Sequence, residues 1–512
     1  MFADNNTLLS IIAIIIANIA NISNIADIVG IRQAVRVFLP LAFIIYRARI
    51  DAPRIDNYNV TWKNKCIERK IKRFFAGCDM ITASSIKDLF ENKENAKLLR
   101  SLYGQRNGSM VWQLERYTSL VNTHASLWGS ERKPRLFSAP GRIELIGNHT
   151  DHNNGKVLAA AITFDTIAAV TLNDIGAARI HSEYGGNAVS LEIPVSDLAV
   201  RDSDKNNALA VLRGALAVSA ERGIKLQGFD ATLKSDVGGG SGLSSSAAFE
   251  VLLLLIIDKL FAESSGVAPA TPGERAEMAQ RVEQEYYGKP CGLMDQMASS
   301  TGGLVAIDFG RSPACVRPIQ FNIQEAGYTI VVVKSGGDHA GLTPHYAAIP
   351  AEMRQVAEYF GKSVLRNVEY AEFISSLSEL RGKVSDRALL RAFHYFDENH
   401  RVTDAVSAAT SGDVETFVDL LGKSGDSSWM LLQNVSAQTD QQPLAISLTI
   451  AKRLLGEKGA ARVHGGGFAG TILCLVPNDR ADYFIDNMNR ALGIRACDAL
   501  DVRPAGACEI PL

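Results

Sequence analysis

The chain has 512 residues, 47% of them apolar, and a formal net charge of −2, so it is long enough for two or three domains with a large buried core. A charge this balanced argues against a nucleic acid or another polyanion as partner. The seven cysteines are odd in number and lack C-x-x-C spacing, which favours reduced thiols in a cytoplasmic protein over a disulfide framework or a zinc site.

Residues 1–79 differ in composition from the rest of the chain. Asparagines interrupt one apolar run, and Arg36 and Pro40 interrupt a second, so neither reaches the ~20 apolar residues of a membrane-spanning helix. No cleavage site follows a charged segment, so a signal peptide is not indicated. We expect Met80 to be the native start. A poorly packed extension and a membrane anchor are the alternatives.

Apolar periodicity predicts the elements that follow. Apolar residues at three- and four-residue spacing predict helices over 86–102 and 111–128. Apolar runs predict strands over 164–172, 188–193, 228–234, 303–308 and 328–334. Apolar residues at helical spacing predict a helix over 207–220 and a broken helical region over 351–421.

A polar, glycine-punctuated segment lies between expected strands at 136–139 and 157–162. Its polar residues are Arg142, Glu144, Asn148, His149, Asp151, His152, Asn153 and Asn154. Carboxylates accept hydrogen bonds from hydroxyls, while amides and imidazoles both donate and accept, so a bent loop of this composition suits a small polyhydroxyl ligand. A solvated loop is the alternative.

A glycine-rich stretch over 235–250 runs into an apolar helix. Glycines 238–240 and Gly242 allow a tight turn, and serines 244–246 stand at the start of the helix. Free N–H groups and the positive end of the helix dipole make this a candidate phosphate site. The stretch matches neither a Walker A loop nor the dinucleotide fingerprint. A turn that merely caps a core helix is the alternative.

Two later segments carry candidate residues. A helix over 273–287 contains Glu283, and Asp295 follows among apolar neighbours, where a carboxylate must be paired or have a shifted pKa. A cap or turn role for Asp295 is the alternative. A second glycine cluster over 465–470 leads into a buried strand, so it either brings backbone close to a ligand or forms a plain hairpin.

In this order and spacing, the motifs together resemble the GHMP sugar kinases, and among them the galactokinases. The matching segments are GRIELIGNHTDHNNG at 141–155, GGGSGLSSSAA at 238–248, CGLMDQ at 291–296 and VHGGGFAGT at 463–471. The resemblance implies an α+β, two-domain GHMP-kinase fold with the active site in the cleft between the domains. It implies a helical segment over 80–130, a ribosomal-S5-like domain over 131–325 and a ferredoxin-like domain over 326–512, with residues 1–79 outside the family.

The resemblance also implies a reaction, the transfer of a phosphoryl group from ATP to the anomeric hydroxyl of galactose. Asp295 would take the hydroxyl proton, and Arg142 would hold Asp295 ionised and stabilise the transferred phosphoryl group. Five positions match sugar-contacting residues, namely Asn148 and His149 at the 6-hydroxyl, Asp151, Gly292 and Tyr346. The ATP phosphates would lie against Gly240, Ser241, Gly242, Leu243, Ser244, Ser245 and Ser246. Ser244 and Glu283 match the Mg²⁺ ligands.

Some positions depart from the family's common pattern and keep alternatives open. Asn148 stands where most galactokinases have Glu, Glu144 where they have Asn, and His152 where Tyr is usual. These changes leave phosphoryl transfer intact but leave open a kinase for another sugar, such as N-acetylgalactosamine or arabinose. A non-catalytic sugar and ATP sensor would need neither Asp295 nor Arg142. We expect a monomer or homodimer without a membrane partner.

Overall fold

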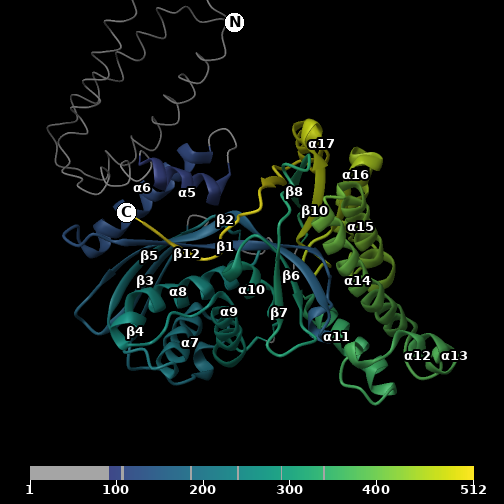
Figure 1. The fold of residues 1–512 in the computed structure, drawn as a ribbon, viewed down its shortest axis with the longest axis horizontal. Helices are drawn as coiled ribbons and strands as arrows, with labels where there is room; N and C mark the ends of the chain where they lie inside the picture. The colour runs from purple at the N-terminus through teal and green to yellow at the C-terminus, as the bar shows by residue number, and fades with distance from the viewer. Residues whose placement is uncertain are drawn as a thin grey trace, which may run out of the picture. The chain divides into compact units, whose positions relative to one another are not determined.

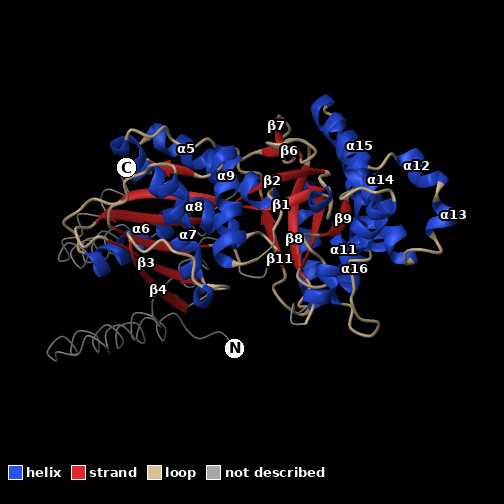
Figure 2. Cartoon of the chain, turned by 90° about the horizontal axis from the view of Figure 1, so that it is seen from below, coloured by secondary structure: helices blue, strands red, loops and turns tan. Residues whose placement is uncertain are grey.

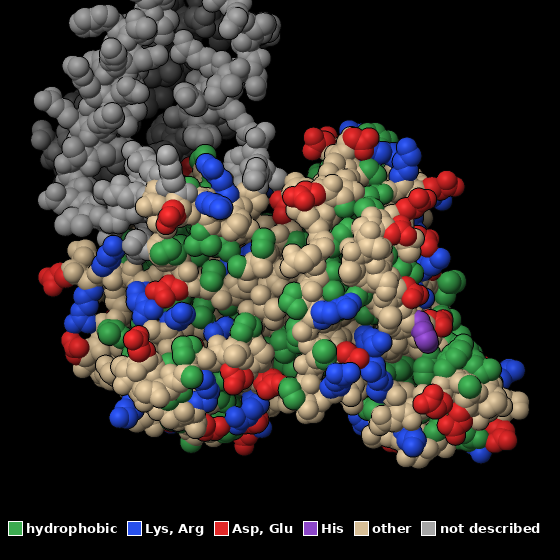
Figure 3. All heavy atoms as spheres, in the orientation of Figure 1, with side chains coloured by type: hydrophobic (Ala, Val, Ile, Leu, Met, Phe, Trp, Pro, Cys, Tyr) green, Lys and Arg blue, Asp and Glu red, His purple; other side chains and the backbone are tan. Residues whose placement is uncertain are grey.

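The computed structural model describes residues 92–104, 109–184, 187–238, 242–289, 291–337 and 341–511. The expectations for residues 1–79, and for Met80 as the start, lie outside these residues. No helix within the described ranges is both long and apolar enough to cross a membrane. Acidic and basic side chains are intermixed over the face seen in Figure 3, in keeping with the small net charge.

The larger of the two sheets in the described residues is mixed and has eight strands (Figure 1). Its strands are β1 (Arg135–Ile146), β2 (Lys156–Leu172), β3 (Ala177–Tyr184), β4 (Asn187–Pro194), β5 (Phe229–Ser235), β6 (Leu304–Asp308), β7 (Cys315–Ile319) and β12 (Cys508–Ile510). The main path runs β12–β1–β2–β5–β3–β4, and β6 and then β7 branch from β2. The described pairs are antiparallel except β3 with β5.

Helices cover both faces of this sheet. One group consists of α7 (Ala208–Glu221), α8 (Ser245–Ser265), α9 (Pro272–Arg281), the π-helix η3 (Val282–Tyr287) and α10 (Met294–Thr301), and the other of α5 (Lys93–Tyr103) and α6 (Ser109–Trp128). Phe137 and Ala168 pack with α7 and α8, whereas their neighbours Leu136 and Ile167 pack with α5 and α6. Since successive strand residues point to opposite faces, the two groups lie on opposite sides of the sheet.

A second, antiparallel sheet is built from the later part of the chain (Figure 2). Its strands are β8 (Tyr328–Lys334), β9 (Ala460–Val463), β10 (Thr471–Pro477) and β11 (Cys497–Leu500), in the order β11–β8–β10–β9. The accompanying helices are α11 (Thr343–Tyr359), α12 (Tyr370–Ser375), α13 (Leu377–Leu380), α14 (Asp386–Ser411), α15 (Val414–Ser427), α16 (Pro443–Leu455) and α17 (Ala481–Leu492).

One apolar cluster joins the two sheets. Ile143 and Leu158 of the first sheet share it with Val332 and Leu473 of the second, and α14 and α15 complete it. The opposite side of the second sheet packs against α16 and α17. The junction between the sheets is therefore a continuous core, and the polar motifs lie beside it.

The fold confirms the predicted α+β class and corrects the predicted segment between strands 136–139 and 157–162. Strand β1 continues to Ile146, so Arg142 and Glu144 lie on a strand and the loop is confined to residues 147–155. Register shifts next to Pro140 and Glu144 let the strand pass a proline and a glycine without ending. The domain boundaries stay predictions, and β12 carries the end of the chain back to the first sheet.

Candidate active site

A cavity of about 230 Å³ lies where the predicted motifs meet. Its lining includes Arg142, Asp151, Glu283, Asp295 and Gly466, which come from the first polar segment, the helices around Asp295 and the second glycine cluster. A larger hollow of about 610 Å³ lies over α15, but the residues lining it include none of the motif residues. The smaller cavity is therefore the candidate site.

Arg142 and Asp295 form a two-pronged ion pair inside this cavity. Nε of Arg142 donates to Oδ1 of Asp295 at 2.8 Å, and Nη2 donates to Oδ2 at 2.7 Å. Arg142 is 6% exposed, while the Asp295 side chain keeps a third of its surface open to solvent. A planar guanidinium holds a carboxylate in a fixed orientation when both bonds form. Asp295 is thus oriented and within reach of a ligand.

The glycine loop is fastened to the same arginine. Nη1 of Arg142 donates to the carbonyl of Gly242, and the backbone N–H of Arg142 donates to the carbonyl of Leu243 at 3.1 Å. Ser244 has a φ of 62° just before α8 and donates its hydroxyl to Asp295. The first turn of α8, with Ser245 and its open N–H groups, therefore lies beside Asp295. The predicted Gly240 and Ser241 lie outside the described residues.

Behind Asp295 lies a buried group of two carboxylates and an amide. Nε2 of Gln296 donates to Glu283 at 2.8 Å and to Glu250 at 3.1 Å, and Lys289 pairs with the other oxygen of Glu283 at 2.8 Å. Burial, followed by the negative charge of Glu283, raises the pKa of Glu250. Oε1 of Glu250 and Oε1 of Gln296 are buried without a hydrogen-bond partner.

Asp151 lies across the cavity on the short turn η1 (Asp151–Asn153). Burial, helped by the charges of Glu144 and Asp295, raises its pKa to about 6. A Cβ atom on Gly292 would lie 1.9 Å from Oδ2 of Asp151, so only glycine at 292 leaves room for this carboxylate. Gly292 therefore owes its place here to close approach between backbone and side chain.

The two histidines of the loop form a directed chain of hydrogen bonds. Nε2 of His149 meets the carbonyl of Gly466 at 3.1 Å and so carries the proton, which leaves Nδ1 to accept from His152 at 3.4 Å. Nδ1 of His152 accepts from Nδ2 of Asn153 at 3.0 Å. Burial lowers the pKa of His149 to about 4 and that of His152 to about 3, so both rings are neutral at physiological pH.

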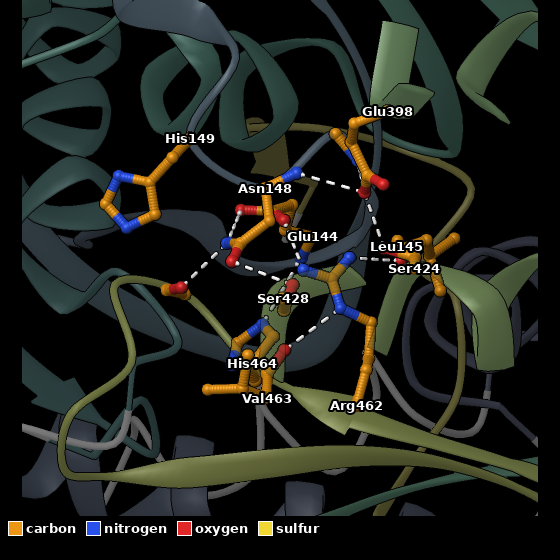
Figure 4. Close-up of polar contacts among 12 residues, drawn as sticks. Glu144, Leu145, Asn148, His149, Glu398, Ser424, Ser428, Arg462, Val463 and His464 are labelled. Atoms are coloured by element: carbon orange, nitrogen blue, oxygen red, sulfur yellow. Dashed lines mark hydrogen bonds and ion pairs between the residues drawn. The ribbon is translucent and has the colours of Figure 1, made fainter. Parts of the chain in front are cut away.

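Asn148 and Glu144 line the cavity, and their side chains are held in a polar network (Figure 4). Asn148 is 1% exposed, and its side chain contacts Glu144 and the carbonyl of Gly465. Glu144 pairs with the fully buried Arg462 at 2.8 Å. His464 accepts the backbone N–H of Glu144 at 3.2 Å. The network joins the first polar segment to the second glycine cluster.

Tyr346 lies one layer behind the cavity. Its hydroxyl donates to the carbonyl of Gly467 at 2.9 Å, and a Cβ atom on Gly466 would lie 2.7 Å from its ring. A Cβ atom on Gly467 would lie 2.1 Å from the carbonyl oxygen of Asn434. The glycine cluster therefore turns the β9–β10 hairpin and admits close neighbours from other segments, while its approach to a ligand stays a prediction.

Comparison with known proteins adds family information to this geometry. The galactokinase galactose-binding signature matches residues 122–172, and the GHMP kinases N terminal domain matches residues 209–303. A galactokinase of Glaesserella parasuis is 32% identical over 71% of this chain and 92% of its own length. A galactokinase of Streptomyces coelicolor is 33% identical over 74% of this chain and 95% of its own length.

The chain belongs to the galactokinase family of GHMP kinases.

Solved structures agree with this membership at the level of the fold. The crystal structure of Lactococcus lactis galactokinase complexed with galactose has a TM-score of 0.65, at 23% identity, over 77% of this chain and 99% of that one. Methanococcus jannaschii mevalonate kinase has a TM-score of 0.52, at 14% identity, over 73% and 99%. The predicted GHMP-kinase fold is confirmed, and family membership implies the use of ATP.

Sequence reasoning missed several residues of this galactokinase-family site. They are Glu250, Lys289, Gln296, His394, Glu398, Asn434 and Arg462. Glu250 had a usable signal, because a carboxylate within the apolar run of α8 must be neutral or paired. Gln296 lies within the matched segment at 291–296 but was not singled out, and only the fold brings the remaining residues together with the site.

The predicted Mg²⁺ residues fit a cation by their chemistry. Mg²⁺ in such sites is held by one or two carboxylates together with substrate phosphates. Glu283 supplies a buried carboxylate, and the unpartnered oxygens of Glu250 and Gln296 lie in the same group. The described residues contain no set of three His, Cys, Asp or Glu side chains arranged to hold a metal by themselves. This donor set suits an ion whose coordination the substrate completes.

Proposed function

We propose that this protein transfers the γ-phosphoryl group of ATP to the anomeric hydroxyl of α-D-galactose, giving galactose 1-phosphate and ADP. The observation that carries the proposal is the Arg142–Asp295 pair, held within one cavity by the glycine loop on one side and facing Asp151 on the other. A carboxylate next to an arginine, with phosphate donors and a hydroxyl acceptor around it, suits phosphoryl transfer to a sugar.

In this mechanism the sugar hydroxyl oxygen forms a bond to the γ-phosphorus while the bond from that phosphorus to the bridging oxygen breaks. Asp295 accepts the hydroxyl proton, and ADP leaves with the bridging oxygen. Arg142 keeps Asp295 oriented and places its positive charge where negative charge spreads over the transferred group. Both residues act by position and charge, which are the main resources available for this reaction.

The start of α8 and its serines bind the ATP phosphates in this proposal. Free N–H groups and the helix dipole favour anions there. Ser244 and Glu283 would hold Mg²⁺, which when bound supplies positive charge to the phosphates. Ser244 now donates to Asp295, so its hydroxyl can serve either partner by rotation.

Asp151 accepts hydrogen bonds from the sugar's ring hydroxyls, and His149 and Gly292 shape the pocket around it. Asp151 lines the cavity opposite Asp295, and Gly292 gives its carboxylate room. Tyr346 acts through Gly466 and Gly467, because its ring and hydroxyl pack on these residues. A cytoplasmic location and the oligomeric state stay predictions.

The test is ADP release by the purified full chain with galactose, N-acetylgalactosamine, glucose, arabinose and no sugar. Turnover with galactose well above the other sugars is the expected result. Turnover confined to another sugar would refute galactose as the substrate while keeping the kinase chemistry. ATP binding without turnover on any sugar would favour the sensor alternative.

A further inference from the structure

Every hydrogen-bond donor and acceptor of the Asn148 side chain is used by a partner within the protein. Oδ1 accepts from Asn434 at 2.8 Å and from Ser428 at 3.3 Å, and Nδ2 donates to the carbonyl of Gly465 at 2.8 Å and to Glu144 at 3.3 Å (Figure 4). An amide offers two donors and two acceptor lone pairs, so these four contacts use all of them. A sugar hydroxyl could reach Asn148 only by displacing one of its partners.

The four partners come from separate parts of the fold. Glu144 lies on β1, Ser428 begins the π-helix η5 (Ser428–Leu432), Asn434 follows η5, and Gly465 lies in the β9–β10 turn. Asn434 is fully buried and also donates to the carbonyl of Gly466 at 3.2 Å. Asn148 therefore ties the loop that carries His149 and Asp151 to the second half of the chain.

Glu144 supplies the negative charge of this network. Its Oε1 accepts from Arg462 at 2.8 Å and its Oε2 from Asn148. Nε of Arg462 donates to the carbonyl of Val463 and Nη1 to the carbonyl of Leu145, and its side chain is fully buried. A buried guanidinium that loses its carboxylate is left as an uncompensated charge, which is strongly destabilising.

Two other charged groups near the loop already have partners of opposite charge, while the Asp151 carboxylate lines the cavity. Glu398 accepts from the backbone N–H groups of Gly147 and Asn148 and pairs with Arg401, and Arg142 is bound to Asp295. Burial lowers the pKa of His394, and more strongly that of His464, so these neighbours add no charge at neutral pH. The network thus accommodates a single carboxylate across positions 144 and 148.

We propose that Asn148 is a positioning residue for the sugar loop rather than a sugar ligand, and that Glu144 and Asn148 act as one exchangeable unit supplying a single carboxylate to Arg462. The inference rests on the proposed function for its substrate. It gives a physical reason for the departure from the family pattern, since the carboxylate has changed place while the charge of the unit stays the same.

The first test exchanges the two residues. Glu144→Asn leaves Arg462 without its carboxylate, and Asn148→Glu adds a second carboxylate beside Glu144, so each alone should lower kcat/KM for galactose at least about 30-fold. The double variant Glu144→Asn/Asn148→Glu keeps the charge and the total side-chain volume, so it should return to within about tenfold of the unchanged protein. A double variant as poor as the product of the two single effects would overturn the proposal.

The second test separates positioning from direct contact. Asn434 does not itself line the cavity, but it bonds Asn148 and Gly466, which do. Asn434→Ala removes these bonds, and it should raise KM for galactose about five- to tenfold while leaving KM for ATP unchanged. Its effect should be equal on galactose and on 6-deoxygalactose, measured as KM or as an inhibition constant. An effect that disappears with 6-deoxygalactose would mean that the network presents Asn148 to the 6-hydroxyl, which overturns the proposal. Asn478→Ala, whose partners are Thr329 and Gln324, is the matched control.

Folding and function are scored separately. If the single variants do not fold and the double variant does, the coupling is supported through stability alone, and a double variant that also fails to fold leaves the decision to Asn434→Ala. If the unchanged protein turns over no sugar, the proposed function fails, and the exchange is then scored by urea unfolding midpoints. Additive midpoint shifts would overturn the coupling in that case as well.

Discussion

Arg142 grips Asp295 through two parallel hydrogen bonds of 2.8 and 2.7 Å, although 153 positions separate the two residues in the chain. The same guanidinium reaches the carbonyl of Gly242 at the start of the serine-rich helix α8. One side chain therefore sets both the orientation of the carboxylate and its distance from the turn that we propose binds phosphate. Arg142 is therefore the residue that connects Asp295 to the glycine loop.

Arg142→Lys should separate charge from geometry. Lysine keeps the positive charge but cannot make both bonds to Asp295 and the bond to Gly242, so kcat should fall by about 10²- to 10³-fold. KM for ATP should change little, because the start of α8 remains intact. Steady-state kinetics with varied ATP and galactose measure both effects. A lysine variant with nearly full kcat would show that charge alone suffices.

The pH dependence of kcat/KM for galactose should report Asp151. Its pKa of about 6 means that the carboxylate becomes protonated below this pH and loses the charge-assisted hydrogen bonds that it accepts from sugar hydroxyls, so kcat/KM should fall about tenfold per pH unit there. His149 and His152, with pKa values of about 4 and 3, stay neutral over this range and cannot produce the same profile. In Asp151→Asn the profile should be low and flat between pH 5 and 7. An unchanged acid limb in that variant would assign the limb to another group.

Ionisation of Asp151 should lower the free energy of unfolding. Its folded pKa of about 6 is above the reference value of 3.8, so the folded state disfavours ionisation, and stability is lost as pH rises from about 4 to about 6. The difference corresponds to about 3 kcal/mol. Asp151→Asn should therefore raise the urea midpoint at pH 8 and leave it unchanged at pH 4. Equal midpoint gains at both values would mean that the gain does not come from the charge.

A buried ion cluster around Asp165, which does not line the cavity, should affect folding stability and not activity. Asp165 is fully buried and accepts from Arg116 at 2.6 Å, from Arg503 at 2.9 Å and from Tyr103 at 2.7 Å, which fastens α5 and α6 to the first sheet. Asp165→Ala leaves the fully buried Arg503 without its carboxylate and Arg116 with Asp236 alone, and it should cost about 3–5 kcal/mol. Chemical unfolding measures the loss.

The matched control for this cluster is Asp174→Asn, which removes an exposed ion pair with Arg132 and should leave the unfolding midpoint unchanged. Where the Asp165 variant is folded, its kcat should equal that of the unchanged protein, because the cluster does not touch the cavity. A reduced kcat in folded protein would show that the cluster acts on the site.

The sequence predicted the strands and helices whose pattern is local. The helix after the glycine loop and strand β8 lie where the apolar runs placed them. Strand β3 was missed, because its side chains are largely polar and its parallel pairing with β5 has no local signal. The three-residue strand β12 is too short to show a pattern and exists through its pairing with β1.

The site was predictable only in part, for the same reason. The motifs named Arg142, Asp151 and Asp295 as candidates, but their meeting in one cavity followed from resemblance and not from spacing. Two partners of Asn148, Ser428 and Asn434, could not be found, since Asn434 is 286 positions away and neither residue lies in a motif. Long-range polar contacts depend on the assembled fold, and an isolated polar residue in a sequence carries no signal that identifies its partner.

The measurement that bears most directly on the account is kcat of Asp295→Asn with galactose and ATP, beside the unchanged protein and Asp174→Asn. The amide keeps the shape of the side chain and a partner for Arg142 but cannot take the hydroxyl proton. The account predicts a kcat lower by about 10²- to 10⁴-fold, with little change in KM for galactose, in protein that remains folded. A folded Asp295→Asn enzyme with kcat within about threefold of the unchanged protein would contradict the role of Asp295 as the group that accepts the proton.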